Sequence, residues 1–143
     1  MAQRKSKQDM TSDLVAFVKS GSSQITLSDF TKLEAALPEM RKEIAKIRKG
    51  SELPHLADHL EFLADVVADF VAGTFPELPC VAAAEVAFAL QYFVREVDII
   101  PDFIPDIGLV DDATIALIVL KDHEKSLRKH PLSSKVDWEA LHG

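Results

Sequence analysis

Aspartate is the residue type in this sequence whose number and spacing could most directly support chemistry. Five aspartates fall within fifteen residues of one stretch. Hard cations such as Mg²⁺ and Ca²⁺ take several oxygen ligands, and a looped backbone can supply carboxylates and carbonyls together. The spacing is not that of an EF-hand loop, and the same carboxylates could instead cap a helix and accept backbone N–H groups in turns. The structural and the metal interpretations both stay open for Asp98, Asp102, Asp106, Asp111 and Asp112.

Two histidines form a second candidate group. His55 and His59 stand four residues apart, with Asp58 beside them. This spacing places both imidazoles on one helix face and can hold Zn²⁺. The sequence indicates no further ligand, and a solvent-exposed polar face gives the same pattern. A zinc site therefore stays an alternative to the interpretation of these residues as a solvent-exposed polar helix face.

Glu85 and Arg95 are charged residues in or next to an otherwise apolar segment. A carboxylate buried without a partner is costly. We therefore expect Glu85 to face solvent at a helix edge or to meet an arginine, with a catalytic carboxylate as the alternative. Arg95 could pair with Asp98 or a later aspartate and neutralise it.

The aspartate stretch repeats itself, as Ile100-Pro101-Asp102 and then Ile104-Pro105-Asp106. Each proline sets its own φ for a tight turn, in which a following aspartate is well tolerated. Gly108 is expected in a left-handed conformation. Asp111 is the expected N-cap of a helix that begins at residue 112. The connection is also rich in isoleucine, so it must be covered by the core, by a partner or by a membrane surface.

The motif Asp98-x-x-Pro101-Asp102-x-x-Pro105-x-x-Gly108-x-x-Asp111-Asp112, preceded by Tyr92, resembles the YkvA-like domain family. This is a bacterial family of unknown function that is also found attached to some membrane-bound RING-type ubiquitin ligases. The similarity covers roughly residues 85 to 120, and the chain departs from the family pattern at Glu96, where proline is usual. The resemblance implies an α-helical module, often linked to membranes, with no established activity.

Periodic apolar residues predict the helices that position these groups. A short helix is expected from residue 11 to Gly21, and a helical hairpin over 28–72 from two heptad-like seams. Pro38 interrupts the first seam without changing its register, which predicts one kinked helix, not two separate helices. Phe62, Val66 and Val71 add a second apolar surface to the other helix, and we expect it to pack on residues 81–93. The seams comprise Phe30, Leu33, Leu37, Met40, Ile44 and Ile47, and then Leu53, Leu56, Leu60, Leu63, Val67 and Phe70.

Two nearly uncharged segments, 78–94 and 112–129, are expected to form the central hairpin, because helices that are apolar on all sides lie in the core. The predicted fold is an all-α, single-domain bundle of about five helices, in which a Pro/Asp-rich connection joins the central pair. Residues 1–10 are expected to be a flexible basic N-terminus, 11–130 the helical domain with 78–129 as its YkvA-like part, and 131–143 a tail. Trp138 is expected to anchor one short turn in that tail.

Composition and charge limit the partners and the compartment that we expect for this protein. The 143 residues are 48% hydrophobic and carry a net charge of −7, which argues against a nucleic-acid partner and against a general anionic-membrane surface. A single cysteine and no visible signal peptide favour the cytoplasm. No uncharged run is long enough to span a membrane.

The sequence favours a non-enzymatic interaction module that docks a partner protein or sits peripherally at a membrane surface, with no cofactor and with homo-oligomer formation left open. The alternative is an activity that depends on Mg²⁺ or Ca²⁺ and uses the carboxylates from Asp98 to Asp112. The two hypotheses differ in the role of the aspartates, because a metal requires their oxygens to converge on one point.

Overall fold

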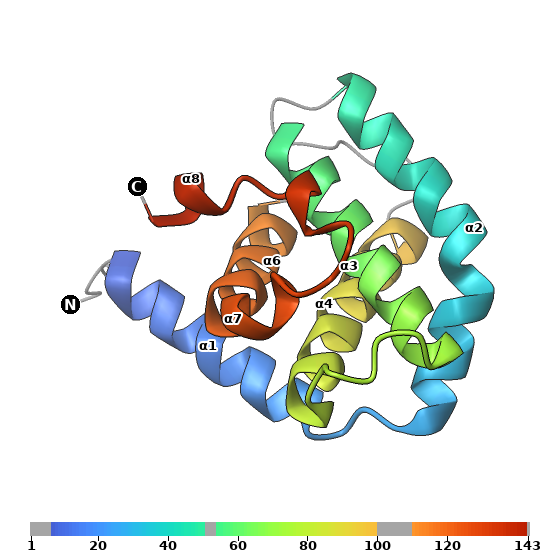
Figure 1. Cartoon of the computed structure of the whole chain (residues 1–143). Coiled ribbons are helices and arrows are strands. Elements are labelled where there is room, and N and C mark those ends of the chain that lie inside the picture. The colour runs from blue at the N-terminus through green and yellow to red at the C-terminus, as the bar shows by residue number, and fades with distance from the viewer. Residues whose placement is uncertain (1–6, 51–53, 100–109, 143) are drawn as a thin grey trace.

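Helices form nearly all of the chain that the computed structural model describes (Figure 1). The description covers residues 7–50, 54–99 and 110–142, without the side chains of 7–12, 54, 95–99, 110, 111 and 142. No strand occurs within these ranges, and the prediction of an all-α fold is confirmed. The elements are α1 (Lys7–Ser22), α2 (Leu27–Gly50), α3 (Pro54–Ala72), α4 (Cys80–Ile99), α6 (Val110–Asp122), α7 (Glu124–Leu127), the 3-10 helix η1 (Ser133–Lys135) and α8 (Trp138–His142).

Thr26, just before α2, and Asp29 in its first turn form hydrogen bonds that cap the start of the helix. The backbone N–H of Thr26 donates to Asp29 Oδ2 at 2.8 Å, and the backbone N–H of Asp29 donates to Thr26 Oγ1 at 3.3 Å. This reciprocal capping box starts the helix one residue before Ser28. The helix then continues through Pro38, so the prediction of one helix is confirmed. Pro38 is exposed, and the seam residues Leu37 and Met40 beside it are buried.

The central position of α4 organises the packing. Figure 1 shows α2 along one edge of the molecule and α1 along the opposite edge, with α3, α4 and α6 between them. α4 contacts α1, α2, α3 and α6, and α2 packs on α3 as the predicted hairpin. Phe62 and Val66 of α3 are fully buried. The expected packing of α3 on α4 is confirmed, and α6 also contacts α3. Phe62 itself, however, meets the rings of His130 and Trp138 in the C-terminal segment, and Val71 is only half-buried.

Several helix ends differ from the predicted ones. α1 begins at Lys7, inside the range expected to be flexible. α4 continues to Ile99, so that Arg95 and Asp98 belong to its last turns and not to the connection. α6 begins at Val110, which places the expected cap Asp111 inside the helix. Such ends depend on local capping and are the least certain part of a sequence pattern.

The prediction of one continuous helix over 112–129 is wrong. The helix breaks at His123, whose φ of −118° and ψ of 23° are not helical, and α7 follows as a separate short turn. The polar run from Lys121 to Lys125 resembles the exposed end of a helix. In the structure, however, the His123 side chain is largely buried, and its Nε2 lies 3.1 Å from Glu85 Oε1 of α4.

The C-terminal segment folds back over α3. Trp138 is buried, and its indole N–H donates to the backbone carbonyl of Ser133 at 2.9 Å. Its ring meets Phe62 edge-to-face, with 5.9 Å between the ring centroids. The predicted anchoring role of Trp138 is confirmed. No helix in the described part of the chain is long and apolar enough to cross a membrane.

Candidate functional site

The aspartate stretch lies largely outside the described residues. This applies to Asp102 and Asp106 and to the turn residues Pro101, Pro105 and Gly108. The backbones of Asp98 and Asp111 are helical, and their side chains are among those not described, as is that of Arg95. Asp112, in the first turn of α6, is buried. The Mg²⁺ or Ca²⁺ hypothesis for this stretch therefore stays a prediction.

The two histidines of the zinc hypothesis differ in their surroundings. On α3, His55 is exposed and His59 is buried. Burial lowers the pKa of His59, the nearby His55 lowers it further, and Asp58 opposes the shift. Asp58 pairs with Arg48 of α2, with 2.5 Å between its Oδ1 and the guanidinium Nη1. Zinc at this position stays a prediction, and the ligand atoms that converge in the described part of the chain belong to another group.

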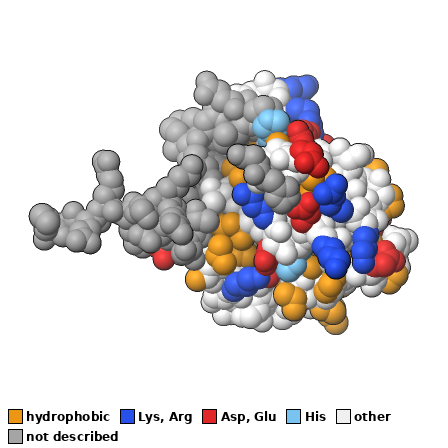
Figure 2. Space-filling view, turned by 60° about the vertical axis from the view of Figure 1, so that its left-hand side comes forward, with side chains coloured by type: hydrophobic (Ala, Val, Ile, Leu, Met, Phe, Trp, Pro, Cys, Tyr) orange, Lys and Arg blue, Asp and Glu red, His pale blue; other side chains and the backbone are white. Residues whose placement is uncertain are grey.

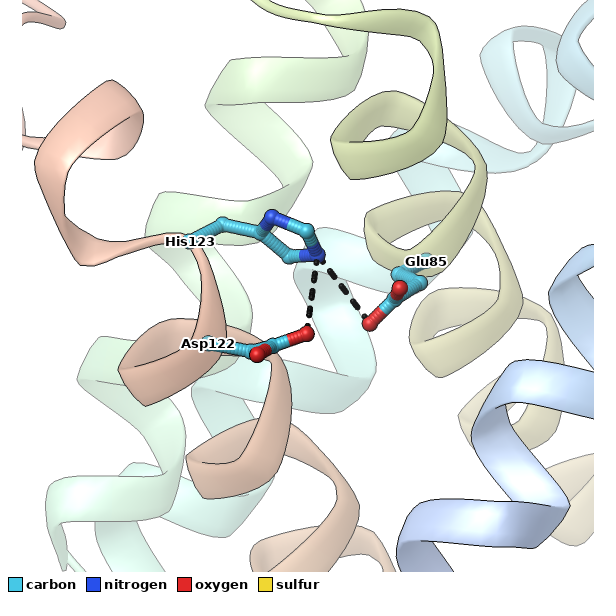
Figure 3. Close-up of side chains that lie close together, drawn as sticks. All are labelled: Glu85, Asp122 and His123. Atoms are coloured by element: carbon cyan, nitrogen blue, oxygen red, sulfur yellow. Dashed lines mark ion pairs between the residues drawn. The ribbon is translucent and has the colours of Figure 1, made fainter.

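That group consists of Glu85, Asp122 and His123, shown in Figure 3. Glu85 lies in α4, Asp122 is the last residue of α6, and His123 occupies the break before α7. One carboxylate or imidazole atom from each residue lies within 4.8 Å of the others. His123 Nε2 is 3.1 Å from Glu85 Oε1 and 3.4 Å from Asp122 Oδ2. The contact between α4 and α6, together with the helix break, therefore creates the cluster.

Lys19 of α1 contacts both acids of the cluster. Its ammonium lies 2.7 Å from Glu85 Oε2 and 2.5 Å from Asp122 Oδ2. The hydrogen bond to Asp122, followed by that to Glu85, raises the pKa of Lys19. The same hydrogen bond from Lys19 lowers the pKa of Asp122. Both groups are therefore charged at neutral pH, and one lysine bridges two acids from different helices.

Glu85 is the most enclosed charged residue of the described chain, because its side chain has no solvent exposure. The expectation that it faces solvent at a helix edge is wrong, because α1 and α6 both pack on α4 at this point. The partner it meets is a lysine of α1, not an arginine. Sequence reasoning selected Glu85 and missed Lys19, Asp122 and His123. The only available signal for the last two was the abrupt polarity that follows Leu120.

A mainly apolar groove of about 500 Å³ opens next to this cluster. Its walls come from the end of α1, the start of α2, the end of α3 and the start of α4. Leu27 is 82% exposed and Val81 is 64% exposed, and both lie in the groove wall with Phe30, Phe70 and the exposed Cys80. Lys19 and Glu85 form the charged end of the groove.

Two further buried polar side chains, Asp65 and His130, form hydrogen bonds that link elements of the fold. Asp65 of α3 is buried and receives hydrogen bonds from Arg41 and Lys135, which tie α2 and η1 to α3. His130 is also buried, with Nε2 at 2.6 Å from Asp69 Oδ2, while its Nδ1 accepts the backbone N–H of Leu132. Because Nδ1 is an acceptor, the ring proton sits on Nε2 and is donated to Asp69. This histidine is therefore a structural link, not an available base.

Figure 2 shows a face of the molecule on which acidic and basic side chains alternate with small hydrophobic areas, without a field of one sign.

The comparisons with known proteins add one finding. No curated protein and no solved structure significantly matches the chain. Residues 82–118, which include most of α4 and the start of α6, match the model of a family described as a protein of unknown function, DUF1232.

Proposed function

We propose that this chain is a non-enzymatic helical interaction module and that its groove binds an amphipathic helix of a partner protein. The observation that carries the proposal is the exposure of Leu27 and Val81 in the wall of one apolar groove. Single exposed apolar residues are ordinary on protein surfaces. Two of them that flank the partly buried rings of Phe30 and Phe70 make a continuous apolar surface, which is typical of binding sites.

A helix suits this groove better than an extended strand. The walls are helix ends, and the described chain offers no sheet edge to which a strand could add. An amphipathic helix binds a groove through apolar residues at i, i+3 or i+4, and i+7. At one end of the groove Lys19 is nearly half exposed and offers a positive group, whereas its partner Glu85 is fully buried. A mainly apolar helix face with a polar end therefore complements the groove.

Charge favours a protein over a membrane as the partner. The chain carries a net charge of −7, which opposes approach to an anionic lipid surface. The proposal keeps the module in the cytoplasm, and a peripheral position at a membrane is the alternative. It also takes the chain as YkvA-like, a relationship that the match over 82–118 supports at the level of an unknown-function family. The metal-dependent activity of Asp98 to Asp112 is the other function proposed, and no observation on the described residues favours it.

The test uses peptides of the stated chemistry. Amphipathic helical peptides are selected from a displayed library against the intact chain, and the dissociation constant of a selected peptide is measured by fluorescence anisotropy. The combined substitution Leu27→Asp and Val81→Asp should weaken binding at least about tenfold, because central apolar anchors of an interface each contribute about 2 kcal/mol or more. Both positions lie in the first turn of a helix, where an acidic residue is favourable, so that folding is retained.

Leu132→Asp is the matched control, since Leu132 is another exposed leucine and lies outside the groove. It should leave peptide affinity unchanged. Equal affinity in both variants would place the binding surface elsewhere and contradict the proposal. If the groove instead binds a membrane or a second copy of the chain, the same variant gives a different result. Sedimentation of the chain with phosphatidylcholine vesicles, abolished only by the groove variant, would make the partner a membrane. A dimer that the same variant dissociates would make it a second copy.

A further inference from the structure

We propose that Glu85, Asp122 and His123 form a binding site for a divalent transition-metal ion of the Zn²⁺ type, and that Lys19 is its built-in competitor. The site adjoins the docking groove, because Lys19 and Glu85 also stand at the charged end of that groove, but its ligands are carboxylate and imidazole atoms and not the apolar groove wall. It also differs in every residue from the His55–His59 group and from the Asp98–Asp112 stretch.

The distances are those of ligands around one ion. A tetrahedral ion with bonds of about 2.0 to 2.1 Å to nitrogen and oxygen holds its ligand atoms about 3.3 to 3.4 Å apart. In the structure, His123 Nε2 lies 3.1 Å from Glu85 Oε1 and 3.4 Å from Asp122 Oδ2. Figure 3 shows the imidazole nitrogen facing both carboxylates. The two separations from His123 Nε2 thus match the ligand spacing around one ion, and all three ligand atoms lie within 4.8 Å of one another.

Two of the three facing atoms are not held by hydrogen bonds, whereas Asp122 Oδ2 accepts one from Lys19. Glu85 Oε1 and His123 Nε2 are both buried, and neither has a hydrogen-bond partner within the described part of the chain. Their separation of 3.1 Å is close enough for an ion pair, but the direction of the ring nitrogen does not make a hydrogen bond. Buried polar atoms without partners are rare and call for a physical reason, and an ion is one such reason. A metal between Oε1 and Nε2 would satisfy both atoms at once.

The donor set selects the class of ion. An imidazole nitrogen with two carboxylates suits Zn²⁺ and similar transition metals, whereas Mg²⁺ and Ca²⁺ prefer oxygen ligands alone. Glu85 is enclosed and His123 is 15% exposed, while Asp122 is 44% exposed. An ion therefore has an entry path on the Asp122 side. Three protein ligands leave a fourth position for water or for a group of a bound partner.

Lys19 contacts the same two carboxylates. Its ammonium contacts Glu85 Oε2 and Asp122 Oδ2, and the second of these atoms is also the one nearest His123. The lysine side chain is 46% exposed and can move into solvent when an ion arrives. The ammonium and the ion therefore compete for Asp122. Removal of the ammonium should strengthen metal binding.

The experiment measures Zn²⁺ binding to the intact chain by isothermal titration calorimetry, with Co²⁺ absorption as a report of coordination. His123→Ala should weaken Zn²⁺ binding at least about 100-fold, because even outer-sphere partners of a ligand contribute about 10- to 100-fold. His55→Ala is the matched control and should leave the affinity unchanged. Lys19→Met should tighten binding about tenfold, as expected when one neighbouring positive charge is removed from a partly exposed site.

Circular dichroism checks that each variant is folded. If His123→Ala fails to fold, Asp122→Asn at the exposed ligand replaces it, with the same expected loss. Loss of Zn²⁺ binding in His55→Ala with full retention in His123→Ala would overturn the proposal in favour of the other histidine pair. No Zn²⁺ binding by either the parent chain or Lys19→Met would overturn it altogether. Weaker binding in Lys19→Met would refute the role of Lys19 as a competitor.

Discussion

Replacing Lys19 with methionine should destabilise the chain more than replacing its buried partner Glu85 with glutamine. Glu85 has no solvent exposure, whereas Lys19 is nearly half exposed. Lys19→Met leaves a buried carboxylate without its ammonium, and breaking a buried pair in this way typically costs about 3 to 5 kcal/mol. The partial exposure of Lys19 reduces this penalty to about 2 to 3 kcal/mol. Glu85→Gln removes the buried charge itself and should cost about 1 kcal/mol.

The free energy of unfolding is measured by urea denaturation at neutral pH in the presence of a chelator, so that no metal contributes. With a slope of about 2 kcal/mol per molar urea, Lys19→Met should lower the midpoint by about 1 to 1.5 M. Lys46→Met is the matched control, because Lys46 pairs with Glu43 at 3.1 Å on an exposed helix face. Its cost should stay below about 0.5 kcal/mol.

The relative free energies of unfolding of the three variants show whether Lys19 is needed to neutralise the buried Glu85. A Lys19→Met midpoint equal to that of Lys46→Met would mean that water reaches Glu85 and that its burial is not a constraint on the fold. A cost of Glu85→Gln greater than that of Lys19→Met would refute the asymmetry. In that case the carboxylate itself, and not its neutralisation, would hold α4 in place.

Three other predictions concern helix ends and packing. Gly21→Ala should destabilise by about 1 to 3 kcal/mol in thermal or urea unfolding, because an added Cβ would overlap a ring carbon of Phe88, whereas Gly50→Ala meets nothing and should gain about 0.5 kcal/mol. Equal effects would contradict this contact. Burial holds the pKa of His59 below its ordinary 6.5, so that on acidification the unfolded chain binds a proton before the folded chain does. The free energy of unfolding should therefore fall as the pH drops through 6.5. His59→Asn should make the free energy of unfolding, measured by urea denaturation, less dependent on pH in this range. Asp29→Ala should cost about 1 kcal/mol through loss of the capping box, and an unchanged midpoint would refute the box.

The periodic part of the fold could be predicted from the sequence. The seams of α2 and α3 keep a constant spacing, so their buried faces and mutual packing follow from helix geometry alone. The continuity of α2 through Pro38 also follows, because the seam residues on both sides keep one register. The same reasoning assigned the extra surface of α3, at Phe62 and Val66, to packing inside the chain.

The candidate site could not be predicted in the same way. Lys19 and Glu85 are 66 residues apart, and only the contact between α1 and α4 brings them together. His123 lies in a polar run that is typical of an exposed helix end, and its burial depends on the docking of α6 on α4. The local pattern marks Glu85 as an unusual acid in an apolar helix, but it identifies neither the burial of Glu85 nor the distant side chain that compensates its charge.

The docking groove is the central functional claim, and Cys80 offers the most direct measurement of it. This is the only cysteine of the chain, it is exposed, and it lies in the groove wall next to Val81. The rate of Cys80 alkylation by iodoacetamide is followed with and without a selected amphipathic peptide at saturating concentration. The account predicts that the peptide slows alkylation of the parent chain and of Leu132→Asp. An alkylation rate that the bound peptide leaves unchanged would contradict the claim that this groove is the docking site.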